Sequence, residues 1–462
     1  MFVLNLLIIV SCAILSATLF YKASGTLAVG KINMVSCIYF LFFMQTFLGI
    51  SLTILGLDKH YTLDKLLYRE YSIRITFVIV MLVSIFFPVM ICLWQKLLKV
   101  KVKDSYSEYL SKKTETKYSS VLFVVIGCGT IILGVLLLIY FVKIGYIPLI
   151  RLFRYPKEFD FATERIRINH TIVIHEYITN ILVLSVIPLL SYVSFAYMLA
   201  TKQRKWMVLA LILFGMSILV ETHNFSKSPV LFYCLILVLI YIYICGGIKT
   251  TYMVGFGFFG LILLAIMYQL TGYEGTYFDI YNGPIGRVVF TQVGTLAYAF
   301  DLFPSVFGFL NGRSLTPSLL GVLGKDPNLH LRSARVVMEY YGSDKVYQGT
   351  AGVMNTVFLG EAYANFGFAG VILSVIVVSI VVVFFFTLCL KLKKTPLMIA
   401  FAAVMTVKVG MVSQGGFFDF IYNADWIVTS IIFIGGYLLF ESDFKVSRVI
   451  SEKLKDVLKF NE

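Results

Sequence analysis

The feature that most constrains this chain is a series of long, continuous apolar runs. The first covers residues 2–21, and runs of similar length recur along the whole chain of 462 residues. An α-helix needs about 20 apolar residues to cross the ~30 Å hydrocarbon core of a bilayer. A membrane barrel would instead show short segments in which apolar and polar residues alternate. The sequence therefore predicts an all-α polytopic membrane protein that forms a single membrane domain.

The apolar runs predict about eleven membrane-spanning helices. We expect them at residues 2–21, 34–57, 75–95, 120–142, 176–200, 206–221, 229–246, 252–270, 358–390, 396–413 and 426–441. The first run has no basic segment before it and no clear cleavage site. We therefore expect it to remain as a helix rather than to be removed as a signal peptide.

Basic residues indicate which way the helices cross the membrane. Clusters begin at Lys96, Lys202 and Lys391, and another follows Glu441. Lys and Arg are enriched in cytoplasmic loops of membrane proteins. All four clusters lie on the cytoplasmic side if the N-terminus is outside and the C-terminus is cytoplasmic. The net charge of +14 then follows from topology, and it does not indicate nucleic-acid binding.

Two outer segments, residues 143–175 and 271–353, are long, and the second precedes the ninth expected helix. The first carries Arg151 and Arg154, which a helical turn would place on one face, and also Arg165. Guanidinium groups bind phosphate in a bidentate fashion, so we expect these arginines to bind the pyrophosphate of a lipid-linked substrate. The alternative is an amphipathic interfacial segment whose arginines touch lipid phosphates and the nearby acidic residues, which are Glu158, Asp160 and Glu164.

The second outer segment begins with aromatic, amide and charged residues between positions 273 and 292. Asn282 and Arg287 lie here among five aromatic side chains. Such a mixture suits a sugar-binding site, although a membrane-interface aromatic belt would also account for the tyrosines. We expect Arg287 to lie near the start of a helix that re-enters the bundle.

The same segment ends with Arg332 and Arg335, again three residues apart, and then enters the ninth helix. On a helix, Met354, Phe358, Glu361 and Asn365 share one face, while Gly360, Ala364 and Gly367 share another that suits close packing. An ionisable group in a membrane helix is a candidate functional group. We therefore expect Glu361 to face a polar cavity; the alternative is that it pairs with Lys408.

The remaining polar residues and the missing motifs narrow the chemistry. All five histidines, at positions 60, 170, 175, 223 and 330, fall on the outer side of this topology. The seven cysteines lie in or beside apolar runs without metal-site spacing, and no nucleotide-binding loop occurs. We therefore expect neither a metal nor another cofactor. An enzyme facing outward would need an activated sugar donor that a lipid delivers.

Several of these stretches resemble one known family. The chain looks like the Wzy-type oligosaccharide repeat-unit polymerases of O-antigen and capsule synthesis. The resemblance rests on the helix count, on the large late outer loop, and on the strings NGPIGRVVFTQ, YAFDLFP, FLNGRS and GVMNTVFLGEAYANFGFAG. The spaced-glycine arginine signature of some members is not cleanly present, so the resemblance does not rank the arginines firmly.

The resemblance implies a glycosyltransferase of the membrane-embedded C type in the cell inner membrane. Such an enzyme would move a growing chain from undecaprenyl pyrophosphate onto a new lipid-linked repeat unit at the outer face. It implies a chain-length regulator and a flippase as partners besides the bilayer, with no nucleic acid. Catalytic roles would fall to Arg287, Glu361, His170 and His175. Substrate binding would fall to Arg151, Arg154, Arg165, Arg332, Arg335, Asn282, Asn355, Asn365 and Lys408.

Three other functions compete with polymerisation. A flippase for lipid-linked oligosaccharide would need a polar path through the bundle, where the sequence places few charges apart from Lys408. A ligase that moves finished glycan onto lipid A core would use a similar donor. An O-acyltransferase would need a histidine deep in the bundle, which this topology does not provide.

Overall fold

The fold was analysed on a computed structural model, which describes residues 2–116, 119–154, 161–172, 175, 179–270, 275 and 279–442. The expected basic tail after residue 442 and the acidic residues Glu158 and Asp160 lie outside these ranges. Within them the regular structure is helical, with no strand. The prediction of an all-α chain is thereby confirmed for the described residues.

The helices follow one another with short connections for most of the chain. The first half contains α1 Phe2–Ser24, α2 Met34–Phe42, α3 Leu48–Ile54, α4 Arg69–Leu97, α5 Val102–Ser111, α6 Ser119–Ile144, α7 Pro148–Arg154, α8 Phe161–Asn169, α10 Ile187–Thr201 and α11 Arg204–Glu221. The second half contains α12 Ser228–Cys245, α13 Thr250–Leu270, α14 Pro284–Leu302, α15 Pro317–Val322, α16 Ser333–Tyr341, α17 Ser343–Tyr347, α18 Val357–Lys391, α19 Pro396–Gly410 and α20 Ala424–Gly436. Shorter 3-10 and π-helical pieces are η1 Val29–Lys31, η2 Phe43–Phe47, η3 Leu63–Lys65, η4 Thr179–Val186, η5 Pro327–Leu329, η6 Phe418–Phe420 and η7 Tyr437–Glu441.

Nine helical segments among the described residues are long and apolar enough to cross a membrane. They are Phe2–Lys31, Met34–Ile54, Arg69–Leu97, Ser120–Ile144, Ile181–Thr201, Ser228–Cys245, Thr250–Leu270, Val357–Lys391 and Phe418–Glu441. The other two expected spans are also helical. α11 carries three charged residues in 18, and α19 has only 15 residues. The chain is therefore a polytopic helical membrane protein.

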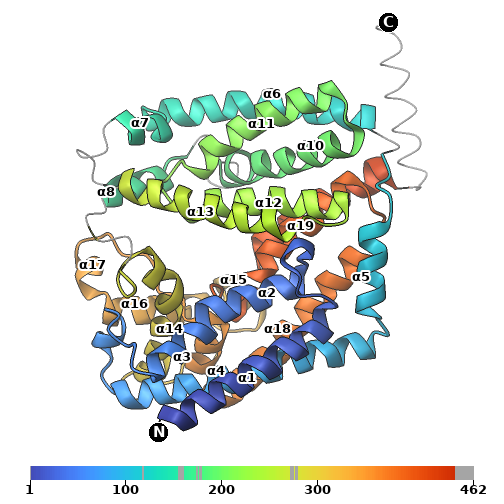
Figure 1. The fold of residues 1–462 in the computed structure, drawn as a ribbon. Coiled ribbons are helices and arrows are strands. Elements are labelled where there is room, and N and C mark those ends of the chain that lie inside the picture. The colour runs from blue at the N-terminus through green and yellow to red at the C-terminus, as the bar shows by residue number, and fades with distance from the viewer. Residues whose placement is uncertain are drawn as a thin grey trace, which may run out of the picture.

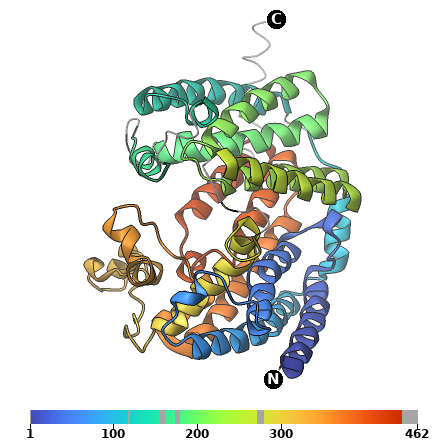
Figure 2. The ribbon, with the colours of Figure 1, turned by 60° about the vertical axis from the view of Figure 1, so that its left-hand side comes forward.

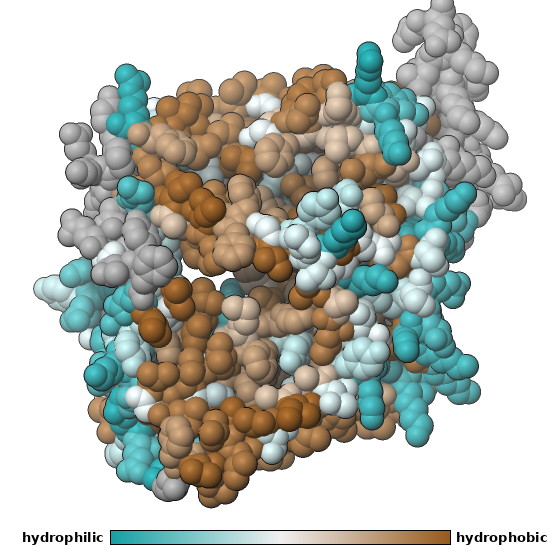
Figure 3. Space-filling model, in the orientation of Figure 1, coloured by the Kyte–Doolittle hydropathy of each residue, from teal (hydrophilic) through white to brown (hydrophobic). Residues whose placement is uncertain are grey.

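Hydrophilic residues gather at two opposite ends of the molecule. In Figure 3 they form the left and right edges, and a broad apolar band lies between them. One end, here called the N-terminal face, carries the N-terminus together with α7, α8 and α17. The opposite end carries α5 and is called the α5 face (Figure 1). Most long helices run from one face to the other, as helices that span a bilayer do.

The helices form two groups, which α19 joins. One group contains α6 and α10–α13, and the other contains α1–α4, α14 and α18 (Figure 1). α19 packs against α10 and α12 on one side and against α2 and α18 on the other. The space-filling surface is hollowed between the two groups (Figure 3). The short helices between positions 317 and 347 stand beside the bundle (Figure 2).

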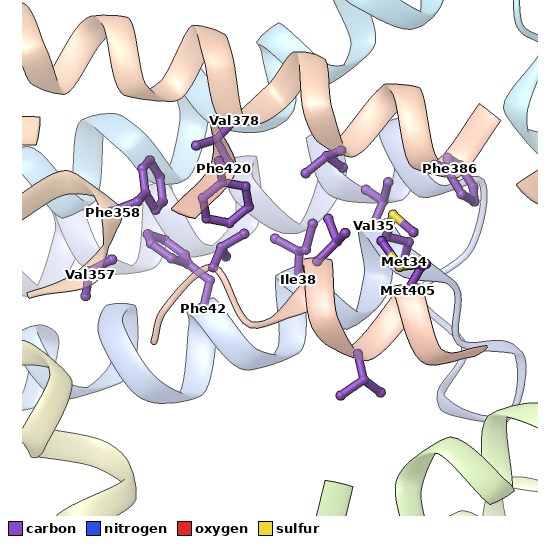
Figure 4. Close-up of a cluster of buried hydrophobic side chains, with 14 of the residues drawn as sticks. Met34, Val35, Ile38, Phe42, Val357, Phe358, Val378, Phe386, Met405 and Phe420 are labelled. Carbon is purple, nitrogen blue, oxygen red and sulfur yellow. The ribbon is translucent and has the colours of Figure 1, made fainter. Parts of the chain in front are cut away.

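The core of the second group is a layer of aliphatic and aromatic side chains around α2. Met34, Val35 and Ile38 of α2 meet side chains of α18 and α19 in Figure 4. The rings of Phe358 and Phe420 lie edge to face with centroids 6.3 Å apart. Such edge-to-face pairs contribute beyond the area that they bury. This core holds α18 in place.

The segment 271–353, expected to be an outer loop, contains a helix, α14, that enters the bundle. The helix starts at Pro284, where a missing N–H and a fixed φ suit the first turn. Its C-terminal half is buried against α4 and α18. Arg287 lies in its first turn, which confirms the expected start of a re-entering helix.

α14 ends at a buried carboxylate that anchors the segment before α4. Asp301 is fully buried and accepts four hydrogen bonds. The donors are Leu67 N at 2.7 Å, Tyr68 N at 2.8 Å, Ser72 Oγ at 2.6 Å and Tyr341 Oη at 2.5 Å. One side chain therefore links α4, α14 and α16.

The ninth expected helix, α18, is broken near its N-terminal end. Phe366 and Gly367 have non-helical backbone angles, and Gly367 has φ +61°. Glycine adopts this left-handed region without steric cost. The carbonyls of Ala364 and Asn365, which lie before the break, accept from Leu310 N and Asn311 N at 2.9 and 3.1 Å. The backbone of Leu310 and Asn311 is thus bonded to α18 at the break.

Candidate functional site

Three cationic side chains come together at the N-terminal face. Arg287 of α14 donates from Nη1 to Tyr268 Oη at 3.4 Å, and the Nζ of Lys227 lies 3.5 Å from the centre of the Tyr268 ring. Arg165 of α8 donates to Ser226 Oγ, beside Lys227, at 2.6 Å. We call Arg165, Lys227 and Arg287 the cation cluster. It lies where the first turns of α12 and α14 meet the end of α13.

The cation cluster holds positive charge that nearby carboxylates do not offset. Burial, together with the charges of Arg287 and Arg165, lowers the pKa of Lys227 to about 8. Within the part of the chain that the structure describes, none of the three forms an ion pair with a carboxylate. Closely spaced cations of this kind form a site for a multiply charged anion.

A second group of arginines lies next to this cluster, on α7 and α8. Arg151 and Arg154 occupy α7, which confirms that their spacing is helical. The guanidinium of Arg151 lies 4.7 Å from the centre of the Tyr146 ring. Arg167 pairs with Glu164 at 2.8 Å, so one expected acidic neighbour does contact an arginine. Burial and the hydrogen bond from Tyr146 to Glu164 raise the pKa of Tyr146 to about 12.

The two histidines expected to act in catalysis occupy exposed positions. His170 lies in the turn that follows α8, and His175 lies between segments outside the described ranges. The structure does not bring either of them to Glu361 or Arg287 through a described contact. His60, in contrast, is fully buried, and its Nδ1 forms a hydrogen bond with Thr62 Oγ1 at 2.6 Å.

A cavity of about 350 Å³ lies between α12 and α19 toward the N-terminal face. We call it the α12–α19 cavity. Its polar lining includes Glu221, Lys408 and Asp425, and its walls include Tyr192 and Trp426. Aromatic walls with a few convergent polar groups are typical of small-molecule sites. The residues that line the α12–α19 cavity come from η4, α10, α11, α12, α19 and α20 and from Met411, which follows α19.

The alternative that Glu361 pairs with Lys408 is wrong, because Lys408 has other partners. Its Nζ donates to a carboxylate oxygen of Asp425 and to Thr429 Oγ1 at 3.2 Å. Asp425 begins α20, so this contact fastens α20 to α19. Glu221, at the end of α11, lines the same cavity and has no hydrogen bond or ion pair to the described residues.

Glu361 is the centre of a buried network rather than an exposed wall of the cavity. It is 4% exposed, and Oε2 accepts from Phe418 N at 3.0 Å. Ser333 Oγ lies 3.5 Å from Oε1. A Cβ on Gly416 would lie 2.3 Å from Oε2, so only glycine fits beside this carboxylate. The expectation that Glu361 faces an open polar cavity is therefore wrong for this conformation.

Asn365 extends the same network one turn later. Its Nδ2 donates to Ser314 Oγ at 2.9 Å and to the Glu361 carbonyl at 2.8 Å. Its Oδ1 accepts from Gly312 N at 3.0 Å. Phe358, Glu361 and Asn365 do share one helical face, but Met354 lies before the helix begins.

Arg332 and Arg335 do not share a helical face. Arg332 precedes α16 with extended backbone angles, so the expected three-residue helical spacing is wrong here. Its Nη2 lies 3.4 Å from Asp419 and 3.5 Å from Asn355 Oδ1. Arg335 points elsewhere and pairs with Glu339 at 2.7 Å. We call Ser333, Glu361, Asn365, Asp419 and Arg332 the Glu361 network.

Asn282 has a positioning contact in this structure. Its Oδ1 accepts from Tyr61 N at 3.3 Å, which ties the segment before α4 to the start of α14. Asp279 accepts from the backbone of Tyr281 and Asn282, forming the turn that leads into α14. These bonds fix the first turn that carries Arg287.

Sequence reasoning assigned no role to Glu221 or Asp301, and it noted Lys227 only as one of the polar residues in the stretch ETHNFSKSP. Lys227 lies two residues before Pro229 at a helix start, and nothing in its local sequence indicates Arg287 as a neighbour. Asp301 had a signal, because it is a lone carboxylate in the apolar stretch YAFDLFP. Glu221 likewise closes an apolar helix.

Comparisons with known proteins add no identification. No family model, curated protein or solved structure matches the chain. Among the described residues there is no group of three or more His, Cys, Asp or Glu side chains that could hold a metal ion.

Proposed function

We propose that this protein polymerises lipid-linked oligosaccharide repeat units at the outer membrane face. The substrates would be oligosaccharides on undecaprenyl pyrophosphate, and the product would be surface polysaccharide of the O-antigen or capsule kind. The proposal takes the N-terminal face as the outer one, as the positions of the basic clusters predict.

The observation that carries the proposal is the cation cluster. Arg165, Lys227 and Arg287 converge around Ser226 and Tyr268 at the edge of the apolar band. A pyrophosphate on a membrane-anchored lipid reaches the protein at this depth. Fixed cations stabilise the negative charge that grows on a departing phosphate group. A neutral sugar ligand alone would not need this arrangement.

In the proposed reaction a hydroxyl oxygen of the acceptor sugar attacks C1 of the donor sugar. The bond between C1 and the pyrophosphate oxygen breaks, and both electrons leave with lipid pyrophosphate. A carboxylate accepts the hydroxyl proton. Glu221 is better placed for this role than Glu361, because it lines the α12–α19 cavity while Glu361 is already bonded to Phe418 N.

The first experiment replaces Arg287 with alanine in a strain that depends on this gene for its surface polysaccharide. Loss of one clamp on the leaving group is expected to lower polymer formation by roughly 100-fold or more. A gel of the surface polysaccharide from this strain should then show single repeat units on their normal anchor. Arg74→Ala is the matched control, because Arg74 forms an ion pair with Glu70 at 2.6 Å and is not part of the cation cluster.

The gel also separates the competing functions. Full-length polymer that accumulates on lipid pyrophosphate after gene deletion would identify a ligase and contradict polymerisation. Loss of every surface glycan, with repeat units trapped inside, would identify a flippase. One observation favours the flippase as a second candidate, since the charged residues Glu221, Lys408 and Asp425 line a cavity between α12 and α19. Wild-type chain lengths in Arg287→Ala would reject the assigned role of the cation cluster.

A further inference from the structure

A lysine-lined pocket lies at the α5 face, on the opposite side of the molecule from the cation cluster. It has a volume of about 510 Å³ and is formed by α5, the end of α1, η1 and the end of α12. Lys31, Lys103, Lys112 and Lys113 line it, together with the hydroxyl-bearing residues Thr26, Tyr106, Ser107 and Ser111. None of the described residues that line it is acidic. We call this site the lysine pocket.

The backbone around the lysine pocket is held in one conformation. Tyr106 Oη donates to the carbonyls of Lys31 and Ile32 at 3.1 and 2.9 Å. Gly25 has φ +75°, and a Cβ there would lie 2.9 Å from the Cα of Lys103. Ile248 N donates to the Gly30 carbonyl at 2.9 Å. The pocket is therefore a fixed concavity rather than a gap between loose lysine side chains.

Helix C-termini meet at the lysine pocket, and their carbonyls would ordinarily attract the lysines. Each helix C-terminus carries about half a negative charge on unsatisfied carbonyls. At α1, however, buried Gln95 donates to the Ala23 carbonyl and buried Asn33 donates to the Ser24 carbonyl, each at 2.8 Å. These two bonds reduce the negative charge that α1 presents to the pocket.

The end of α5 is likewise occupied. Buried Lys394 donates to the Leu110 carbonyl at 3.1 Å and lies 5.1 Å from the centre of the Tyr109 ring. Burial lowers the pKa of Lys394 to about 8, so it stays mostly charged at pH 7. Because Lys394 already serves this helix end, the lysines that line the pocket are not needed for it.

The four lysines of the pocket are left without anionic partners. In the described ranges none of them forms an ion pair or a side-chain hydrogen bond. Four charges around a fixed concavity with hydroxyl donors suit a phosphate group, which accepts several hydrogen bonds. The ligand should therefore carry a phosphate.

The position of the pocket favours a lipid as the source of that phosphate. Apolar Leu110 and Ile244 form part of its wall, and α1 runs from it toward the N-terminal face. Only 11% of the residues in the most apolar stretch of the helical segment Phe2–Lys31 are buried, so the exposed apolar side chains of α1 can contact acyl chains. We propose that the lysine pocket binds the phosphate headgroup of an anionic phospholipid in the leaflet at the α5 face. This proposal does not depend on the proposed glycosyl transfer.

The test measures lipid retention by the full-length protein with native mass spectrometry. The protein is purified in a neutral detergent and titrated with phosphatidylglycerol or phosphatidylcholine. Wild type should retain at least one phosphatidylglycerol at concentrations where phosphatidylcholine is lost. Lys103→Gln, Lys112→Gln and Lys113→Gln, combined, should weaken retention at least five-fold. Arginine at the same three positions should preserve it and shows that the fold tolerates change there.

A matched control removes three charges from the same face outside the pocket. It combines Lys96→Gln, Lys202→Gln and Arg204→Gln, and it should change retention less than two-fold. Equal weakening in both triple variants would mean that binding is diffuse attraction, which overturns the proposal. Equal retention of the two lipids by wild type would also overturn it. Displacement of phosphatidylglycerol by millimolar inorganic phosphate would identify a soluble anion as the ligand and overturn the lipid assignment.

Discussion

The buried carboxylate Asp301 gives the sharpest stability prediction. Replacing it with alanine removes an acceptor from four donors, two on the backbone before α4 and two on Ser72 and Tyr341. The two side-chain donors are buried, and each would be left unsatisfied at a cost of about 1–3 kcal/mol. Loss of the bonds to Leu67 N and Tyr68 N adds about 1 kcal/mol, as for a lost helix cap. We expect Asp301→Ala to lower the free energy of unfolding by roughly 3–7 kcal/mol.

The assay is equilibrium unfolding of the detergent-solubilised protein, followed by helical circular dichroism. Ser72→Ala is the graded control, because it removes one of the four donors and should cost about 1 kcal/mol. Asp301→Asn keeps the shape but loses the charge, so its effect should fall between the two. A destabilisation of less than about 1 kcal/mol in Asp301→Ala would refute the view that this residue anchors α4, α14 and α16. Burial and the bond to Asp301 raise the pKa of Tyr341, so the phenol should stay protonated as a donor throughout the assay.

Three further predictions follow from single positions. Burial and the charge of Arg287 lower the pKa of His60 to about 4, although the charges of Asp64 and Asp279 act in the opposite direction. The folded state therefore disfavours the protonated histidine, and the free energy of unfolding should fall by about 3 kcal/mol as the pH drops from above 6.5 to 4. Unfolding measured across this range should lose that component in His60→Gln. Gly416→Ala should cost about 1–3 kcal/mol in thermal unfolding because its Cβ would overlap the buried glutamate, whereas Gly435→Ala, with open space around it, should not destabilise. Cysteine at Tyr347, which is 96% exposed, should react with an impermeant maleimide on intact cells, and cysteine at Lys113 only after permeabilisation; the reverse pattern would contradict the expected orientation.

Local composition alone was sufficient to locate the helices. Each expected span coincides with a helix, although only nine meet the criteria of length and hydropathy among the described residues. The reason is that membrane insertion depends on the apolar content of about 20 consecutive residues, which one segment carries by itself. The turn that starts α14 was also readable, because Gly283 and Pro284 act through their own backbone.

The polar contacts at the N-terminal face could be identified only from the tertiary structure. Local sequence patterns predict that Glu361 faces a cavity or pairs with Lys408, yet its partner is the backbone N–H of Phe418, 57 residues away. Lys408 bonds instead to Asp425, which starts the next helix. A hydrogen bond needs atoms within about 3 Å, and helix packing sets such distances over long separations in the chain. Periodicity can predict which face of a helix carries a residue, but it cannot predict which residue of another helix that face contacts.

The sequence by itself determined a helical membrane protein and the positions of its spans, because both depend on local hydrophobicity. It also brought forward the arginines of the N-terminal face as candidates for phosphate binding. Only the tertiary structure shows that Arg287 lies beside Lys227 and Arg165, because the three residues belong to α14, to the start of α12 and to α8. It likewise decided the break in α18, where the Leu310–Asn311 backbone bonds to carbonyls before Gly367. These outcomes depend on which helices pack together, and no local pattern encodes that.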